Sequence, residues 1–401
     1  MAKGILQLRD FIVDYVRRNQ PVSRLGIARE FEMYASTVGN IVEGLLEDGL
    51  LIETDECRET PSAGRPPRFL RVNPGSGQFL GIDVYRRQLT AVLTDFSGNL
   101  RGDTSVSFPA RADRRLVIGA MISASQRLLT AEGASPDSLK GIGVGLPGLV
   151  DREAGVALSY RPIRRWQDVP VRDILESTLG VPASVEHNSN TMALGEACFG
   201  DAAPYDHVVS VLLRTGVSLG EAQHRDIPRT SPIGAGELGH TIINVRGPRC
   251  WCGTRGCLEA YASGWALRKR LWRHLRHHPD WPGRDAFDEQ GVFDPAVICE
   301  LARNGDPKSE ESLRNVFHYL AIGVNTIARL IAPDAVVING SFNAAGDLIR
   351  EEILAVLNRP LDHPLRIPQV IVSSQGDRMG ALGAALMAAS RFCNPVHRIP
   401  V

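Results

Sequence analysis

The 401-residue sequence lacks a net charge, a long apolar run and an apolar stretch among its first residues. Lysine plus arginine and aspartate plus glutamate number 45 each, so no overall field favours nucleic acid or a membrane surface. The apolar runs 141–150 and 319–328 end at a charge, after about half of the ~20 residues that a bilayer requires. Arg9, Asp10 and Asp14 interrupt the first stretch, so we expect no signal peptide. We therefore expect a cytoplasmic protein without a membrane partner.

Cysteine is also scarce, and its odd total of seven does not favour a framework of paired disulfides. Three of the seven fall close together, as Cys250, Cys252 and Cys257, and His240 precedes them by ten positions. One imidazole and three thiolates complete a tetrahedral sphere with no open position for a reactive water. This set predicts a structural zinc ion (Zn²⁺). Unmetallated thiols in a reducing compartment are the alternative.

The first 72 residues have the pattern of a winged helix-turn-helix domain. Apolar side chains recur at helical spacing in three segments, and Ser23 stands where an N-cap of the second helix is expected. Two extended runs follow the helices and would form the wing. The three helices and two extended runs are expected over residues 5–18, 24–31, 35–49, 50–56 and 67–74.

In a winged helix-turn-helix the third helix enters the major groove, where its first turn meets phosphates and base edges. We therefore expect double-stranded operator DNA as a partner. The predicted contacts lie at helix starts or in the wing loop and are Ser23, Arg24, Ser36, Thr37, Asn40 and Arg65. Residues 1–75 nevertheless carry ten basic and eleven acidic side chains, whereas a DNA-binding domain is usually basic. A three-helix protein-interaction module is the alternative, although the arginines of two copies can still assemble a positive face.

A different pattern begins after a polar linker at 73–78. Buried strands alternate with helices, and glycines follow the strand ends, which favours an α/β architecture that binds a ligand at those ends. Five stretches resemble the ROK family of repressors, open reading frames and sugar kinases: GIGVGLPGLVD, VEHNSNTMALGEACFG, GELGHTIINVRGPRCWCGTRGCLEAYAS, VVINGS and GDRMGALGAALMAA. The resemblance covers nearly all of residues 1–393 and, with the front domain included, is to the repressor branch.

The resemblance implies a two-lobed body with a hexokinase/actin-like fold. Lobe 1 would comprise 79–200 and 376–393, and lobe 2 would comprise 201–375 with a zinc loop at 237–259. The resemblance also implies that a sugar or sugar derivative binds in the cleft between the lobes. The residues implied to contact this effector are Gly148, His187, Asn188, Glu237, His240 and Glu259.

Sugar phosphorylation in this family requires an aspartate base and two glycine-rich phosphate loops, and the sequence departs from all three. Asn188 stands at the position of the aspartate, and an amide has no useful basicity. Tyr85 and Arg86 occupy glycine positions of the first loop and Arg214 occupies one of the second, so side chains obstruct backbone approach to a phosphate. We therefore expect no catalytic residue and no enzyme activity. An active sugar kinase that carries a DNA-binding domain is the alternative.

Together these features predict a transcriptional repressor that acts as a homodimer or homotetramer. Closure of the lobes on the sugar would change the spacing of the DNA-reading heads and thereby the operator affinity. A ligand-independent regulator with a decayed sugar site and a partner-binding adaptor stay open as alternatives. Arg86, Arg87 and Arg214 also leave open a phosphorylated sugar as the effector.

Overall fold

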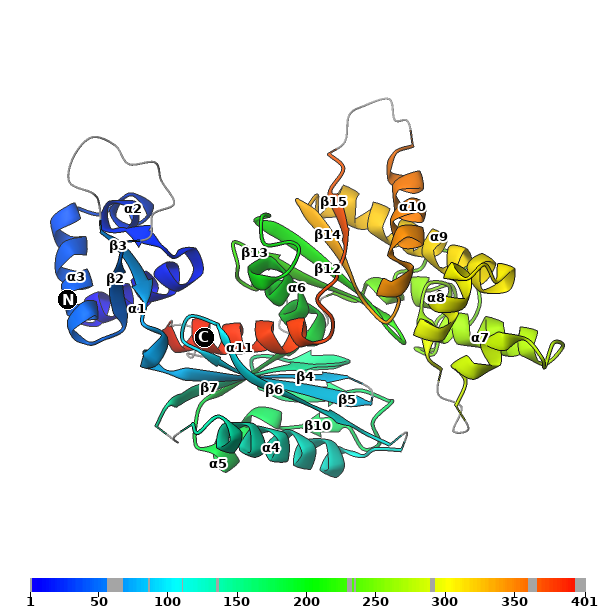
Figure 1. Ribbon diagram of the computed structural model, residues 1–401, viewed down its shortest axis with the longest axis horizontal. Coiled ribbons are helices and arrows are strands. Elements are labelled where there is room, and N and C mark those ends of the chain that lie inside the picture. The colour runs from blue at the N-terminus through cyan, green and yellow to red at the C-terminus, as the bar shows by residue number, and fades with distance from the viewer. Residues whose placement is uncertain are drawn as a thin grey trace.

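The chain folds into a front domain and a body that is built on two larger β-sheets, as Figure 1 shows. The front domain lies beside the last turns of the C-terminal helix α11 (Arg378–Cys393), which crosses one face of the first of these sheets. This computed structural model describes residues 2–55, 68–85, 87–109, 111–134, 137–228, 233, 236–288, 293–359 and 366–393.

The front domain has the winged helix-turn-helix order that the sequence predicted. Its elements are α1 (Ala2–Asn19), β1 (Val22–Ser23), α2 (Arg24–Glu30), α3 (Ala35–Glu47), β2 (Leu51–Thr54) and β3 (Phe69–Val72). The expected wing of two strands is part of a three-stranded antiparallel sheet of order β1-β3-β2, because Val22 and Ser23 pair with β3. The predicted cap is present: the Ser23 hydroxyl accepts a hydrogen bond from the Gly26 amide at 3.0 Å.

Lobe 1 is the part of the body built on a five-stranded sheet of order β11-β7-β4-β5-β6. Its strands are β4 (Gln78–Tyr85), β5 (Gln88–Asp95), β6 (Leu100–Ser107), β7 (Leu139–Leu146) and β11 (Ala183–His187). The central strands are apolar runs buried on both faces, as strands covered by helices require. One face is covered by α4 (Arg114–Ala131) and α5 (Val171–Leu179). A small antiparallel sheet adds β8 (Leu149–Asp151), β9 (Val156–Ser159) and β10 (Gln167–Val169).

Lobe 2 is the part built on a four-stranded sheet of order β13-β12-β14-β15. Its strands are β12 (His207–Leu213), β13 (Val217–Gln223), β14 (Ala335–Gly340) and β15 (Gln369–Val372). Its helices are α7 (Gly264–Leu275), α8 (Pro295–Arg303), α9 (Pro307–Leu330) and α10 (Gly346–Leu357), and they share one apolar core with the sheet. The longest of them, α9, begins where Asp306 accepts the Ser309 amide at 2.8 Å and Pro307 takes the first helical position.

Two helices lie between the sheets and connect the lobes: α6 (Asn188–Phe199) and α11. Helix α6 packs against β12 and β13 and also against α11, which lies on β4 and β7. The approach of α11 to lobe 1 is so close that a Cβ atom at Gly81 or Gly143 would come within 2 Å of a carbonyl oxygen of α11. Only glycine permits this packing.

The front domain shares a core with the body. Ile12, Val13 and Val16 of α1 belong to the same buried apolar cluster as Ala385 and Ala389 of α11. The segment expected as a linker contains a short 3₁₀ turn at Pro74–Ser76, and two of its side chains donate hydrogen bonds to the Gly49 carbonyl. The front domain is therefore docked on α11. Among the described helices, none combines the length and the apolar character that crossing a bilayer demands.

Candidate functional site

Four side chains of lobe 2 converge in the arrangement of a metal site. His240, Cys250, Cys252 and Cys257 each offer one ligand atom, and these atoms all lie within 4.8 Å of one another. His240 Nδ1 is 3.8 Å from Cys250 Sγ, and Cys252 Sγ is 3.7 Å from Cys257 Sγ. A central ion bonded to each of them at about 2.0–2.3 Å would span these separations. The cluster predicted from spacing is therefore assembled and can hold a metal ion.

Backbone turns bring the cysteines together. Gly253 and Gly256 have φ values of +102° and +74°, a region that favours glycine. The Cys250 amide donates to the Thr254 carbonyl at 2.8 Å, which closes a tight turn between the first and last cysteines. A Cβ atom at Gly256 would lie 1.6 Å from the Asn244 carbonyl oxygen, so this loop cannot close with another residue there.

Three predicted effector residues gather around this cluster. His240 directs Nδ1 toward the cysteines, while its Nε2 lies 3.8 Å from Glu237 Oε2. Glu259, which is 4% exposed, accepts the Val217 amide on Oε2 at 3.0 Å and the Trp251 indole N–H on Oε1. Burial raises the pKa of Glu259 to about 7, although the Val217 amide acts in the opposite direction. Both oxygens of Glu259 thus already have protein partners, and a sugar hydroxyl would share or replace one of them.

Trp251 is a site residue that the sequence interpretation missed. It lies between two of the cysteines, and its ring meets the His240 ring edge-on at a centroid distance of 5.4 Å. Arg161 of lobe 1 donates to the Trp251 carbonyl at 3.0 Å, and its guanidinium lies over the indole at 5.8 Å. Trp251 therefore links lobe 1 to the metal loop. The only sequence signal was an aromatic residue between two ligand cysteines.

The start of α6 carries the predicted residues His187 and Asn188. His187 caps the helix by accepting the Ser189 amide on Nδ1 at 3.3 Å, and burial lowers its pKa, which favours the neutral imidazole. Asn188, 4% exposed, donates its amide to the Val84 carbonyl at 3.1 Å. The Ser189 hydroxyl donates to the Leu219 carbonyl of β13 at 2.7 Å, so this helix start joins the two lobes.

Two further contacts define the surroundings of this helix start. Gly148 lies in the turn between β7 and β8 with a φ of +77°, and a Cβ atom there would meet the Ser159 carbonyl at 2.3 Å. The Leu219 amide of β13 donates a hydrogen bond to the Gly236 carbonyl at 2.9 Å. Glu237 directly follows Gly236 and therefore lies close to β13. Strand β13 thus stands between the α6 start and the metal loop.

The residues that replace the phosphate-loop glycines form an ionic cluster. Arg214 lies 3.6 Å from Asp83 and 2.9 Å from Asp377, and its guanidinium stacks 4.0 Å from the centre of the Tyr85 ring. Tyr85 donates its hydroxyl to Asp377 at 2.8 Å. Burial raises the pKa of Asp83 to about 7 despite the nearby Arg214. Arg86 lies outside the described residues. Side chains of both lobes and of the segment before α11 therefore fill this region.

A cavity of about 460 Å³ adjoins this cluster at the carboxyl ends of β14 and β15. Its lining residues come from β14, the 3₁₀ turn Asn343–Ala345, α10, β15 and the segment before α11: Gly340, Asn343, Gly346, Asp347, Arg350, Val372, Ser373, Ser374, Gly376 and Asp377. The position agrees with the expectation that ligand space lies beyond strand ends.

Three of the six expected DNA-reading residues share the exposed side of α3. Ser36, Thr37 and Asn40 are exposed on the first turns of this helix, whereas the Ser23 hydroxyl is used for capping α2. Tyr34, which directly precedes α3, is 85% exposed and was missed by the sequence interpretation. An exposed ring beside a predicted recognition helix can contact sugar or thymine methyl groups in a groove.

The arginines of the front domain are less free than expected. Arg24 pairs with Glu43 at 2.7 Å and with Glu53 at 3.1 Å, and Arg68 also pairs with Glu53. These arginines, Arg68 foremost, hold the pKa of Glu53 below its ordinary value. Arg65 lies outside the described residues. Phosphates would therefore compete with Glu43 and Glu53 for Arg24.

Comparison with known proteins places this arrangement in a family. Residues 79–391 match the ROK family. A putative xylose repressor of Caldicellulosiruptor sp. (strain Rt8B.4) is 27% identical, covering 94% of each chain. The N-acetylglucosamine repressor of Escherichia coli O157:H7 is 26% identical, covering 94% of this chain and 90% of its own.

Solved structures agree with the fold. A ROK family transcriptional regulator, described as a homologue of the E. coli MLC protein, superposes with a TM-score of 0.78, at 22% identity and over 98% of both chains. A ROK family glucokinase from Streptomyces griseus, in complex with glucose and AMPPNP, gives 0.67 at 27% identity, over 78% of this chain and 99% of its own. The body therefore has the hexokinase-like fold, and the chain belongs to the ROK family.

Proposed function

We propose that this chain is a sugar-responsive transcriptional repressor without kinase activity. One observation carries the proposal: the repressor relative and the regulator structure align over 94–98% of the chain, front domain included, whereas the glucokinase aligns over 78% of it. The part of the chain that the glucokinase does not match includes the winged helix-turn-helix. Its third helix exposes polar side chains suited to a DNA groove. Because the front domain carries no excess of basic side chains, we expect two copies to assemble the positive face that meets the operator.

The metal cluster supports a structural zinc ion beside the effector site. Zinc bound to His240 Nδ1 would fix the ring and leave Nε2 directed at Glu237, so that both groups are oriented for sugar hydroxyls. Asn188 and Gly148 of lobe 1 would complete the site when the lobes close. Because the relatives are repressors named for xylose and N-acetylglucosamine, the effector class is a neutral sugar or its derivative.

Operator binding tests this function directly. We expect specific binding to DNA upstream of the chain's own gene, measured by fluorescence anisotropy against a scrambled competitor at fixed salt. D-xylose, D-glucose, N-acetyl-D-glucosamine and their phosphates are the probes. Asn40→Ala should weaken specific binding by about 5–150-fold, the equivalent of one lost base contact, while weak binding to scrambled DNA persists. Asn315→Ala, an exposed helical asparagine of lobe 2, is the matched control.

Three results separate the alternatives. Equal affinity for scrambled and upstream DNA would refute the repressor and favour the protein-interaction module. Specific binding that no sugar changes would favour a ligand-independent regulator. A change in operator affinity caused only by the sugar phosphates would indicate that Arg214 contacts the phosphate group of the effector.

Kinase activity is expected to be absent. Wild-type protein with ATP, Mg²⁺ and each sugar should release no ADP above background, because Asn188 cannot accept the hydroxyl proton. Asn188→Asp should not restore turnover, since Tyr85 and Arg214 still fill the phosphate region. Coupled ADP release and mass spectrometry of the sugar are the measurements, with an active ROK glucokinase as positive control. Sugar phosphate formed by the wild type would instead establish the active-kinase alternative.

A further inference from the structure

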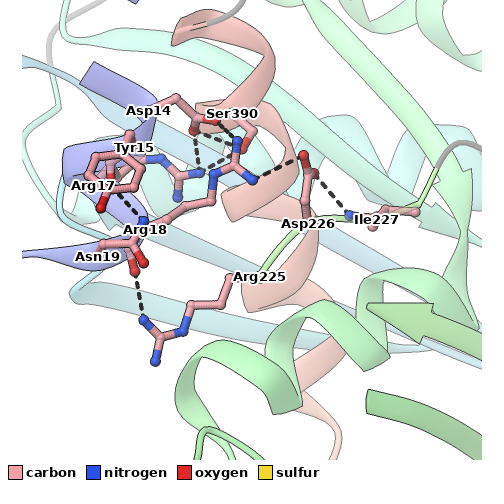
Figure 2. A network of polar contacts seen from close by, with 9 residues as sticks. All are labelled: Asp14, Tyr15, Arg17, Arg18, Asn19, Arg225, Asp226, Ile227 and Ser390. Carbon is pink, nitrogen blue, oxygen red and sulfur yellow. Dashed lines mark hydrogen bonds and ion pairs between the residues drawn. The ribbon is translucent and has the colours of Figure 1, made fainter. Parts of the chain in front are cut away.

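Helix α1 of the front domain is held by the body at two places, which Figure 2 shows together. The first is buried. Arg17 Nη2 donates to Asp14 Oδ1 at 2.8 Å and to Ser390 Oγ of α11 at 2.6 Å, and the Ser390 hydroxyl contacts Asp14 Oδ1 at 3.0 Å. The side chains of Asp14 and Arg17 are 2% and 4% exposed. We call this triad the α11 anchor.

The second place is in lobe 2 and is open to water. Arg18 Nη1 pairs with Asp226 Oδ2 at 3.2 Å, and Arg225 Nη1 donates to the Arg18 carbonyl at 2.7 Å. The side chains of Arg18 and Asp226 are 21% and 36% exposed. Since water can replace both partners, this contact is much easier to break than the α11 anchor. We call it the lobe 2 contact.

Strand β13 connects the lobe 2 contact with the candidate effector site. At its start, the Val217 amide is bound by Glu259, and further along Leu219 accepts the Ser189 hydroxyl. At its end, Gln223 and Asp226 exchange two backbone hydrogen bonds that close the turn. A strand of seven residues spans roughly 20 Å as one stiff element. Displacement of the site end of β13 therefore displaces the turn that holds α1.

We propose that the lobe 2 contact transmits the state of the effector site to the DNA-reading head. Arg18 bonds Asp14, which α11 fixes, and also Asp226, which moves with lobe 2. A rotation of lobe 2 against α11 must therefore make or break the Arg18–Asp226 pair, while the α11 anchor keeps the head attached. This inference rests on the proposed function and adds the route by which a sugar would alter operator affinity.

The variant Asp226→Asn tests the route. Asparagine keeps the oxygen that accepts the Ile227 amide at 2.9 Å, so the turn is retained, but it loses the charge that binds Arg18. The measured quantity is the ratio of operator Kd with and without saturating sugar, using D-xylose and N-acetyl-D-glucosamine as probes. Such ratios are roughly 5–150-fold in allosteric proteins, and we expect the variant's ratio to fall at least about threefold. By reciprocity, the ratio of the sugar Kd with and without operator should fall by the same factor.

A matched control and a second readout keep the test decisive. Glu311→Gln removes one carboxylate and an exposed ion pair with Lys308 at 2.9 Å on α9, without touching the front domain. Its ratio should equal that of the wild type. Hydrogen exchange followed by mass spectrometry should show that sugar changes the protection of residues 15–19 in the wild type and in Glu311→Gln, but not in Asp226→Asn.

Failure has two distinguishable forms. If neither these probes nor the other sugars and sugar phosphates used to test the proposed function change the operator affinity of the wild type, the proposed function fails and this route with it. If the wild type responds and Asp226→Asn responds equally, in both affinity ratio and exchange, the repressor stands and the lobe 2 contact is not the route.

Discussion

Replacing Cys257 with serine is expected to abolish stoichiometric zinc binding and to lower the Tm by roughly 10 °C or more. Cys257 is fully buried, and its backbone forms an isolated β-bridge with Ile242 across the metal loop. Structural zinc contributes apparent free energies of about 10–16 kcal/mol in small zinc-binding peptides, and only part of that total needs to stabilise this loop. At about 2–4 °C per kcal/mol, the loss of a few kcal/mol gives the stated fall in Tm. Sugar affinity should fall by about 10–100-fold because His240 is no longer oriented.

The measurements are metal content by mass spectrometry, Tm by calorimetry and sugar affinity by titration calorimetry. Cys299→Ser is the matched control, since Cys299 is equally buried but lies in the core of lobe 2 outside the metal cluster. It should lose some stability as a buried polar substitution while keeping one zinc per chain. Full zinc occupancy in Cys257→Ser, or a wild type purified without any metal, would contradict the zinc assignment.

Asp14→Ala is expected to destabilise the docked front domain by about 3–5 kcal/mol, because it leaves the buried Arg17 guanidinium without a counter-charge. Specific operator binding should weaken as a result. The matched control is Asp48→Ala, which breaks the exposed ion pair with Arg9 in the same domain. This substitution should lower the free energy of unfolding by only about 0–1 kcal/mol. Urea unfolding of both variants measures the difference. Equal destabilisation by the two substitutions would show that the buried Asp14–Arg17 pair contributes no more to stability than the exposed Asp48–Arg9 pair.

The Asp14 effect should depend on pH. Burial alone would raise the pKa of Asp14, but Arg17 and Arg18 outweigh it and hold the pKa below its ordinary value of 3.8. A lowered pKa in the folded state means that the stabilisation is fully present above pH 3.8 and is lost as the pH falls through the folded-state value. The stability difference between wild type and Asp14→Ala should therefore be constant from pH 5 to 7 and shrink below about pH 4. A difference that did not shrink at all between pH 5 and pH 3 would contradict a carboxylate origin.

Local patterns in the sequence were sufficient for much of this architecture. The three front helices follow apolar spacing and a serine cap, and the metal ligands lie within 18 positions, so turn-forming glycines suffice to join them. The α/β body follows from buried strands that end in glycine. These features depend on residues that are close together in the chain, so local sequence patterns are enough to predict them.

Contacts between distant segments were not predictable in this way. Ser390 and Asp226 meet α1 across separations of 376 and 208 positions, and neither lies in a recognisable motif. The pairing of Arg24 with Glu43 and Glu53 depends on how α2, α3 and the wing pack, so counting charges overestimated the free basic groups. Trp251 was missed because its role depends on Arg161, which comes from the other lobe.

The position of Ser390 in the α11 anchor has a consequence for synthesis of the chain. Asp14 leaves the ribosome first, while its partner is made 376 residues later, at about 5–20 residues per second and thus about 20–75 s afterwards. During this interval the apolar side of α1 has no α11 to pack against. A nascent chain or a fragment that lacks α11 would therefore present its DNA-reading head without the α11 anchor, and only a chain that includes α11 can hold that head at both places.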